Sequence, residues 1–227
     1  MNRSKKYNES LKKIDSSKRY DLDETIKLLP SISYSKFAGS IEVSIFLNLN
    51  EKQKKESIRG SYSLPHSFGS SVKVLVLCEK GEEKSAVGAD FVGSDDLIKE
   101  IEDGKSDFDV VVTTPSMMPK IAKLGKFLGA KGLMPNPKNG TITTDLEGTI
   151  KTFKSGKKNY KASEFGLINA IVGKTDMKPE AIKENMQAFL GLIFNDIKKF
   201  GPNPIKNISV SPTMGPKINL DVNKVVS

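Results

Sequence analysis

The feature that most constrains the fold is a change of hydrophobic period along the chain. Between residues 72 and 130, continuous apolar runs alternate with segments of helical spacing, in the order VKVLVLC, SDDLIKEIEDG, FDVVVTT and MMPKIAKLGKFLG. Continuous apolar runs are typical of strands buried on both faces, and helices between such strands favour a parallel sheet. The middle of the chain therefore predicts a small parallel-sheet α/β domain of Rossmann-like type.

Both ends of the chain follow a different pattern. Ile41, Val43, Ile45 and Leu47 alternate with mostly polar residues, which indicates a strand with one covered face. Asp21 and Glu24 suggest a capping box at the start of a helix over residues 21–32. Further strands are expected at residues 58–64, 166–173, 206–212 and 217–222, and a long helix at 178–200. The predicted fold has two domains: a split α+β domain formed by both termini, residues 1–66 and 158–227, and an inserted α/β domain, residues 67–157.

The charge distribution supports this division. The net charge is +9, with an excess of +5 in residues 1–65, 0 in residues 66–157 and +4 in residues 158–227. Within the middle part, residues 79–109 hold 4 lysines against 11 acids, whereas residues 110–144 hold 5 lysines and no acid. A basic chain suggests a polyanionic partner, so we expect the terminal domain to face nucleic acid. The five lysines of residues 110–144 predict a secondary basic surface on the middle domain; they are Lys120, Lys123, Lys126, Lys131 and Lys138.

Few residues are available for catalysis, metal binding or membrane insertion. Cys78 is the only cysteine and lies in an apolar run, and His66 is the only histidine, so we expect no metal site and no cofactor. The predicted strands of the middle domain are not followed by the glycine-rich turns that cradle phosphate. No apolar run reaches the roughly 20 residues that span a bilayer, and the basic N-terminus lacks the pattern of a secretory signal. We therefore expect the chain to be cytoplasmic, to have no enzymatic activity and to have no membrane partner.

The most informative segment is KLGKFLGAKGLMPNPKNGT, residues 123–141. Its glycines and prolines predict a helix that stops and continues as a tightly turned basic loop. GLMPNPK followed by Gly-Thr resembles the signature of the ribosomal protein L-one family. The resemblance extends along the chain through Lys36-Phe37, Arg59-Gly60, Leu64-Pro65-His66, Ile171-Val172-Gly173-Lys174 and Thr213-Met214-Gly215-Pro216.

This resemblance implies a discontinuous domain with an insertion, and binding to the stalk region of large-subunit ribosomal RNA. It further implies help in releasing tRNA from the exit site, possible repression of the chain's own mRNA, and a monomer when the protein is free of the ribosome. The implied RNA-binding residues are Lys36, Phe37, Ser40, Lys161, Lys174, Ser211, Thr213, Met214, Gly215 and Pro216. Lysines can neutralise phosphates, Phe37 can contact a ribose or base, and an open turn suits recognition of RNA by shape.

The chain departs from the family pattern at a few positions. Ala38-Gly39 stand where two acids are usual, and Asn169 and Ile171 stand where His and Pro are common. From the residues alone, a nucleotide-dependent enzyme with an active site between two domains remains the alternative function.

Overall fold

The computed structural model describes residues 4–50, 58–69, 72–79, 81, 86–102, 107–201, 204–222 and 224. The chain forms two compact units. Unit 1 combines Met1–Phe68 with Tyr160–Ser227, and unit 2 comprises Gly69–Asn159. Both divisions of the chain lie two residues beyond the boundaries expected from the sequence.

Unit 1 is an α+β structure built around a four-stranded antiparallel sheet. Its helices are α1 (Lys5–Leu11), α2 (Leu22–Ile32), α8 (Pro179–Ile197) and the short 3-10 helix η5 (Lys198–Phe200). Its sheet has the strand order β7-β1-β8-β9, formed by β7 (Leu167–Lys174), β1 (Ser40–Leu47), β8 (Ile205–Pro212) and β9 (Ile218–Leu220). The central strand β1 comes from the N-terminal part of the chain and its three neighbours from the C-terminal part, so neither part could form this sheet alone.

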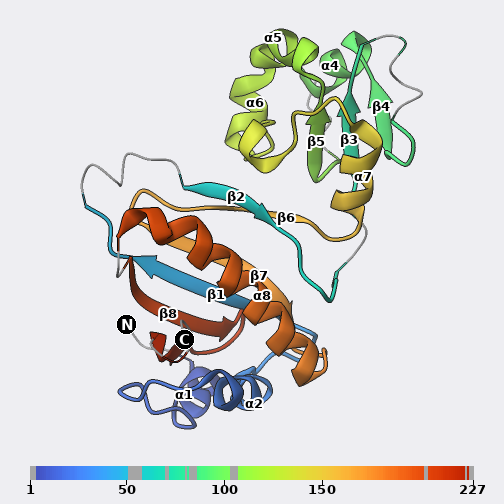
Figure 1. The fold of residues 1–227 in the computed structure, drawn as a ribbon. Helices are drawn as coiled ribbons and strands as arrows, with labels where there is room; N and C mark the ends of the chain where they lie inside the picture. The colour runs from blue at the N-terminus through green and yellow to red at the C-terminus, as the bar shows by residue number, and fades with distance from the viewer. Residues whose placement is uncertain are drawn as a thin grey trace. The chain divides into compact units, whose positions relative to one another are not determined.

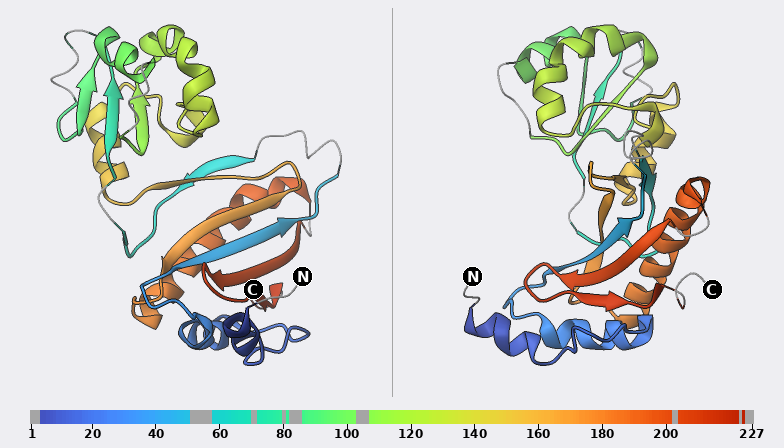
Figure 2. Two further views of the ribbon diagram at one scale, coloured as in Figure 1. Left: turned by 180° about the vertical axis from the view of Figure 1, so that it is seen from behind. Right: turned by 90° about the vertical axis from the view of Figure 1, so that its left-hand side faces the viewer.

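One face of this sheet carries the core of unit 1. Ile41, Val43 and Ile45 of β1 are fully buried, and the residues between them are half-exposed, as the alternating pattern predicts. The helices α2 and α8 lie on the buried face (Figure 1), with Leu29 and Phe189 among the buried side chains of the cluster. No helix crosses the opposite face of the described strands, which is turned toward the viewer in the left view of Figure 2. The unit therefore has one covered and one open sheet face.

The predicted helix over residues 21–32 is confirmed, but the expected capping box at its start is wrong. Asp21 is the N-cap residue of α2, yet its side chain makes no capping hydrogen bond. It instead accepts a hydrogen bond from Nζ of Lys224 at 2.8 Å. An ammonium group far along the chain has replaced the backbone donor that local sequence favoured.

A two-stranded ribbon, β2 (Arg59–Tyr62) with β6 (Lys158–Lys161), carries the chain toward and away from unit 2. Its aromatic rings pack on α8: the ring centroids of Tyr62 and Phe189 are 4.9 Å apart, and those of Tyr160 and Phe189 are 6.5 Å apart. The hydroxyl of Tyr62 donates to the carbonyl of Ile171, and that of Tyr160 donates to Asp196. Burial raises the pKa of Tyr62 to about 12, and burial together with Asp196 raises the pKa of Tyr160.

Asn185 fixes the segment that follows β2. It lies fully buried on α8, and its Oδ1 accepts from the backbone N–H of His66 at 2.9 Å. Its Nδ2 donates to the carbonyls of His66 and Val172, each at 2.9 Å. The amide thus joins the chain near the first crossing to both α8 and β7. The ring Nε2 of His66 also lies 2.7 Å from Oε2 of Glu184, at the surface.

Unit 2 confirms the predicted parallel α/β architecture. Its sheet has the order β4-β3-β5, with all pairs parallel, formed by β4 (Phe91–Gly93), β3 (Val74–Leu77) and β5 (Val110–Thr113). The remaining elements are α4 (Asp95–Glu102), η2 (Pro115–Met117), α5 (Met118–Ile121), η3 (Ala122–Leu124), α6 (Gly125–Ala130), η4 (Pro137–Asn139) and α7 (Leu146–Lys154). Separate apolar clusters cover the two sheet faces, as continuous apolar strands require.

Some details of unit 2 differ from the sequence expectations. The single helix expected over residues 117–129 is a succession of short α and 3-10 turns, and Gly125, a poor helix former, stands where the 3-10 turn η3 gives way to α6. The strand β4 and the helix α7 had no counterpart among the expected elements. The short β4 is only partly buried, so its apolar signal is weak.

Candidate nucleic-acid interface

Three segments that are distant in sequence meet at one end of the unit 1 sheet. The backbone N–H of Tyr34, in the loop after α2, donates to the carbonyl of Met214 at 3.3 Å. The N–H of Thr213 donates to the carbonyl of Ser40 at 2.9 Å, and the N–H of Thr175 donates to the carbonyl of Gly39 at 2.9 Å. The loop before β1, the end of β7 and the turn after β8 therefore form one surface.

This surface brings together most of the candidate RNA-binding residues. Ser40 and Lys174 are cross-strand partners, and Ser211 lies opposite Glu42. Phe37 is 68% exposed and Met214 is 39% exposed, although both residue types are usually buried. Lys36 and Thr213 are also exposed, Gly215 is half-buried and Pro216 is buried. Pro216 can shape the turn but offers little surface to a ligand.

Glu42 belongs to this surface and was missed among the candidates. Its Oε1 accepts a hydrogen bond from the hydroxyl of Thr213 at 2.7 Å. That hydroxyl also lies 3.1 Å from the carbonyl of Ser40. The alternation of β1 contained the signal, because Glu42 shares the open face with Ser40. A lone carboxylate in a basic domain did not suggest RNA binding, whereas its position beside Thr213 makes it an acceptor for hydroxyl groups.

Gly215 allows the turn to lie close to α2. A Cβ at this position would lie 2.6 Å from Cγ of Pro212 and 3.0 Å from the carbonyl oxygen of Ile32. Backbone cannot move aside as a flexible side chain can. The absence of a side chain at Gly215 is therefore what permits the turn and the end of α2 to approach.

Lys161 lies elsewhere. It ends β6, and the next residue, Ala162, is bridged to Ile168. Ile168 pairs with Ile45, close to the end of β1 that lies away from Ser40. The structure thus separates Lys161 from the cluster formed by the other candidates of unit 1.

The five lysines of the secondary basic surface are all exposed on unit 2. Lys120 is paired with Asp95 of α4 at 2.9 Å, and Nζ of Lys131 lies 4.5 Å from the ring centroid of Phe127. Lys120 therefore links the acidic and basic stretches instead of standing apart from the acids. Residues 80, 82–85 and 103–106 of the acidic stretch lie outside the described residues.

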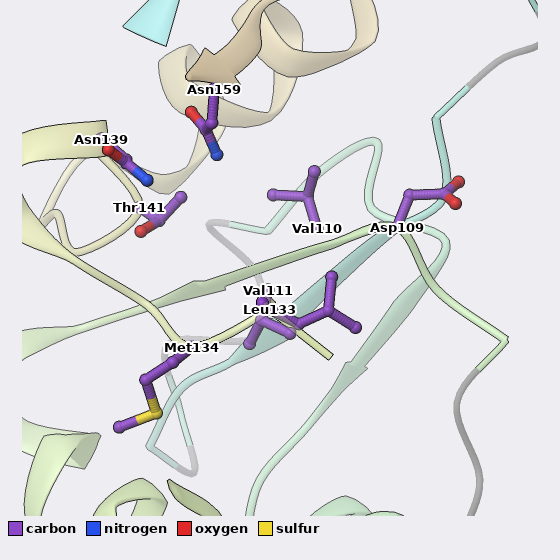
Figure 3. Close-up of a pocket in the computed structure, with 9 residues that line it drawn as sticks. Asp109, Val110, Val111, Leu133, Met134, Asn139, Thr141 and Asn159 are labelled. Carbon is purple, nitrogen blue, oxygen red and sulfur yellow. The ribbon is translucent and has the colours of Figure 1, made fainter. Parts of the chain in front are cut away.

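The signature loop packs against the unit 2 sheet. The N–H of Thr113 donates to the carbonyl of Thr141 at 2.9 Å, and the N–H of Thr143 donates to the carbonyl of Thr113 at 3.0 Å. Figure 3 shows a small pocket beside this loop, with Asn139, Thr141 and Asn159 along one side. Its volume of about 30 Å³ suits one or two water molecules and is too small for a nucleotide. The glycines and prolines here serve a structural loop.

The described residues hold neither a candidate metal-binding group nor a candidate membrane span. They contain no group of three or more His, Cys, Asp or Glu side chains arranged to hold a metal ion. Within the same part of the chain, no helix is both long and apolar enough to cross a membrane.

Comparison with known proteins identifies the class to which this fold and surface belong. Residues 28–216 match the Ribosomal protein L1p/L10e family. The chain is 44% identical to the large ribosomal subunit protein uL1 of Kosmotoga olearia, covering 99% of this chain and 98% of that protein. It is 44% identical to the uL1 protein of Borrelia duttonii, with coverage of 96% and 97%, and 40% identical to that of Streptococcus gordonii, with coverage of 98% and 99%.

The chain belongs to the Ribosomal protein L1p/L10e family. It is a ribosomal protein and not an enzyme, and the resemblance drawn from its motifs is confirmed. The alternative of a nucleotide-dependent enzyme is set aside by this membership.

Proposed function

We propose that the chain is a structural component of the large ribosomal subunit, where unit 1 binds the stalk region of the large-subunit RNA in the cytoplasm. The observation that carries this proposal is the convergence of three distant segments around the exposed Phe37 and Met214. Burying such side chains against a partner removes apolar area from water, and the relatives are named for the large ribosomal subunit.

The chemistry of this surface suits RNA. Lys36 and Lys174 supply positive charge for phosphates, and Phe37 supplies a ring for a base or ribose. Ser40, Ser211 and Thr213 offer hydroxyls, and an ionised Glu42 can only accept hydrogen bonds. A 2′-hydroxyl can donate to such a carboxylate, whereas DNA has no group at that position. The surface thus favours RNA over DNA.

Binding of the stalk RNA is tested by titrating the full chain with that RNA segment and with an unrelated hairpin of equal length. Phe37→Ala should weaken stalk binding by about 1 to 3 kcal/mol with little change in salt dependence. Lys36→Ala should reduce the slope of log affinity against log salt by about one. Equal affinity of the wild-type chain for both RNAs would contradict the proposal.

The matched control for Phe37 is Phe165, which is 78% exposed in the turn between β6 and β7. Phe165→Ala removes a similarly exposed ring away from the proposed site, so it should leave the affinity unchanged. A titration with ATP and GTP belongs to the same series, because tight nucleotide binding would also contradict the proposed role.

For unit 2 we propose contact with the exit-site tRNA through the secondary basic surface, and so a part in tRNA release. Lys123, Lys126 and Lys138 carry exposed ammonium groups, and Lys120 contributes less because Asp95 partly neutralises it. Replacing these three lysines by Gln should reduce tRNA cross-linking to ribosomes that carry the variant, while stalk binding stays intact. Unchanged cross-linking would remove tRNA from the proposal.

Binding to the chain's own mRNA would follow from the same unit 1 surface if that mRNA folds into a mimic of the stalk site. Translation of a reporter behind the native leader should then fall when the wild-type chain is supplied, and should not fall with Phe37→Ala. Repression that persists with this variant would point to a different surface.

A further inference from the structure

The open face of the unit 1 sheet extends well beyond the proposed site. Ser40, Glu42, Ser44 and Phe46 succeed one another along β1 on this face, and all four are half-exposed. Six residues of a strand span roughly 20 Å. Only the first two positions belong to the surface around Phe37 and Met214, so half of this face has no assigned role.

The middle of this face is a polar row that crosses the sheet. Ser44 of β1 lies opposite Asn169 of β7 and Ser209 of β8, and Ser209 lies opposite Asn219 of β9. Asn169 is exposed and the other three are half-exposed. Hydroxyl and amide groups both donate and accept hydrogen bonds, so this row can meet riboses and bases in many orientations.

An aromatic ring and a lysine stand at the far end of the same face. Phe46 lies opposite Leu167 and Asn207, and Nζ of Lys206 lies 5.1 Å from its ring centroid. The register shift next to Phe46 leaves Lys206 without a partner in β1, and a bulge of this kind can redirect a side chain. The lysine is therefore able to lie above a ring on the open face.

We propose that the RNA-binding surface continues along the open face of unit 1 to Phe46 and Lys206, where an unpaired nucleotide stacks on the ring and the lysine meets its phosphate. This inference rests on the proposed binding of the stalk RNA by the surface around Phe37. It adds a second aromatic contact roughly 20 Å from the start of β1. An open four-stranded sheet with helices behind it and aromatic rings on its free face is also the arrangement by which RNA-recognition domains stack bases.

The interaction energies favour a nucleobase over the ammonium of Lys206 as the group that lies on the ring of Phe46. An exposed contact between an ammonium group and an aromatic ring stabilises by about 0.5 to 1 kcal/mol. Stacking of a nucleobase on an aromatic side chain contributes about 1 to 3 kcal/mol. The ammonium of Lys206 can leave the ring and pair with the backbone phosphate of the same nucleotide. Glu42 is the one acidic residue among the open-face positions of β1, and it is at the opposite end from Phe46.

The inference is tested by titrating the full chain with the stalk segment of the large-subunit RNA. Phe46→Ala should raise the Kd by about 5- to 150-fold, as loss of one stacked base implies, while the salt slope stays the same. Phe46→Tyr keeps the ring and should bind like the wild type. Lys206→Gln should lower the salt slope by about one.

An exposed lysine of unit 1 serves as the matched control for Lys206. Lys198→Gln removes this lysine at the end of α8 and should leave both the affinity and the salt slope like those of the wild type. Phe46→Leu keeps the apolar packing on the sheet without the aromatic face, so its affinity should fall even if Phe46→Ala does not fold.

The outcomes separate this inference from the proposed function. If Phe37→Ala weakens binding while Phe46→Ala, or Phe46→Leu where the alanine variant is unfolded, stays within about twofold of the wild type, the extended surface is wrong and the primary site stands. Twofold corresponds to about 0.4 kcal/mol, well below the stacking range. If the wild-type chain does not distinguish the stalk RNA from an unrelated hairpin, both proposals fail together.

Discussion

Gly215 illustrates how a single missing side chain shapes the proposed RNA surface. Its would-be Cβ meets both the ring of Pro212 and the carbonyl of Ile32. Gly215→Ala should lower the free energy of unfolding of unit 1 by about 1 to 3 kcal/mol, since one of these two neighbours is backbone. All five tyrosines lie in unit 1 and the chain has no tryptophan, so tyrosine fluorescence during urea unfolding reports this unit alone.

The matched control for Gly215 is Gly191 in α8. A Cβ there would have no atom within 4 Å, and helix propensity favours alanine. Gly191→Ala should therefore be neutral or stabilise unit 1 by up to about 1 kcal/mol. Equal destabilisation by both substitutions would show that the close approach at Gly215 is unimportant.

Asn185 is a second residue whose effect extends beyond its own position. Asn185→Ala should destabilise unit 1 by about 1 to 3 kcal/mol, because it leaves the backbone N–H of His66 and the carbonyl of Val172 without their buried partner. The comparison is Asn195→Ala on the same helix, where the amide is exposed and its Oδ1 accepts a hydrogen bond from Nζ of Lys198 at the surface. That change should stay within about 0.5 kcal/mol of the wild type. Similar losses of stability in both variants would argue against a special role for the hydrogen bonds that Asn185 makes to His66 and Val172.

Among the secondary-structure elements, the ribbon of β2 and β6 has a distinct pH response. Burial raises the pKa of Tyr62 to about 12, whereas an unfolded tyrosine ionises near pH 10. Between these values the unfolded chain has lost a proton that the folded chain retains, so stability is complete below pH 10 and falls as the pH rises toward 12. Tyr62→Phe should flatten this alkaline decline. Ionisation of all five tyrosines together near pH 10 in the folded protein would contradict the prediction.

The elements also show where sequence patterns succeed and where they fail. The strands β1, β3 and β5 and the helix α8 were predicted because burial on one or both faces imposes a regular spacing on apolar residues. The helix α7 was not predicted, although Leu146, Ile150 and Phe153 recur at helical spacing, because its nine residues include Gly148, Thr149 and Thr152, which are weak helix formers. The strand β4 has only three residues and could not be recognised by period.

For the molecule as a whole, unit 1 should carry the affinity for stalk RNA without unit 2. Its core cluster contains no residue of unit 2, and the terminal segments hold the entire net charge. A chain that joins residues 1–68 to 158–227 through a short Gly-Ser linker should bind within about threefold of the full protein, a difference below 1 kcal/mol. Log affinity should fall with log salt at a slope of about −3 to −5 if roughly four to six phosphates are neutralised.

The comparison chain for this experiment is the isolated unit 2, residues 69–159, whose net charge is close to neutral. It should bind the stalk RNA weakly and without preference over an unrelated hairpin. Strong binding by unit 2 alone would show that the principal RNA contact lies on unit 2. A flat salt response of unit 1 would contradict the neutralisation of several phosphates by this unit.

The sequence by itself determined the fold class and the family, because hydrophobic period and local motifs are properties of neighbouring residues. Only the tertiary structure decided which distant residues meet. Strand register placed Lys174 beside Ser40 and left Lys161 apart, and it brought Glu42 next to Thr213. The open face with Phe46 and Lys206 likewise depends on which sheet face the helices cover. Register and layer packing arise from long-range contacts, so no local pattern could have specified them.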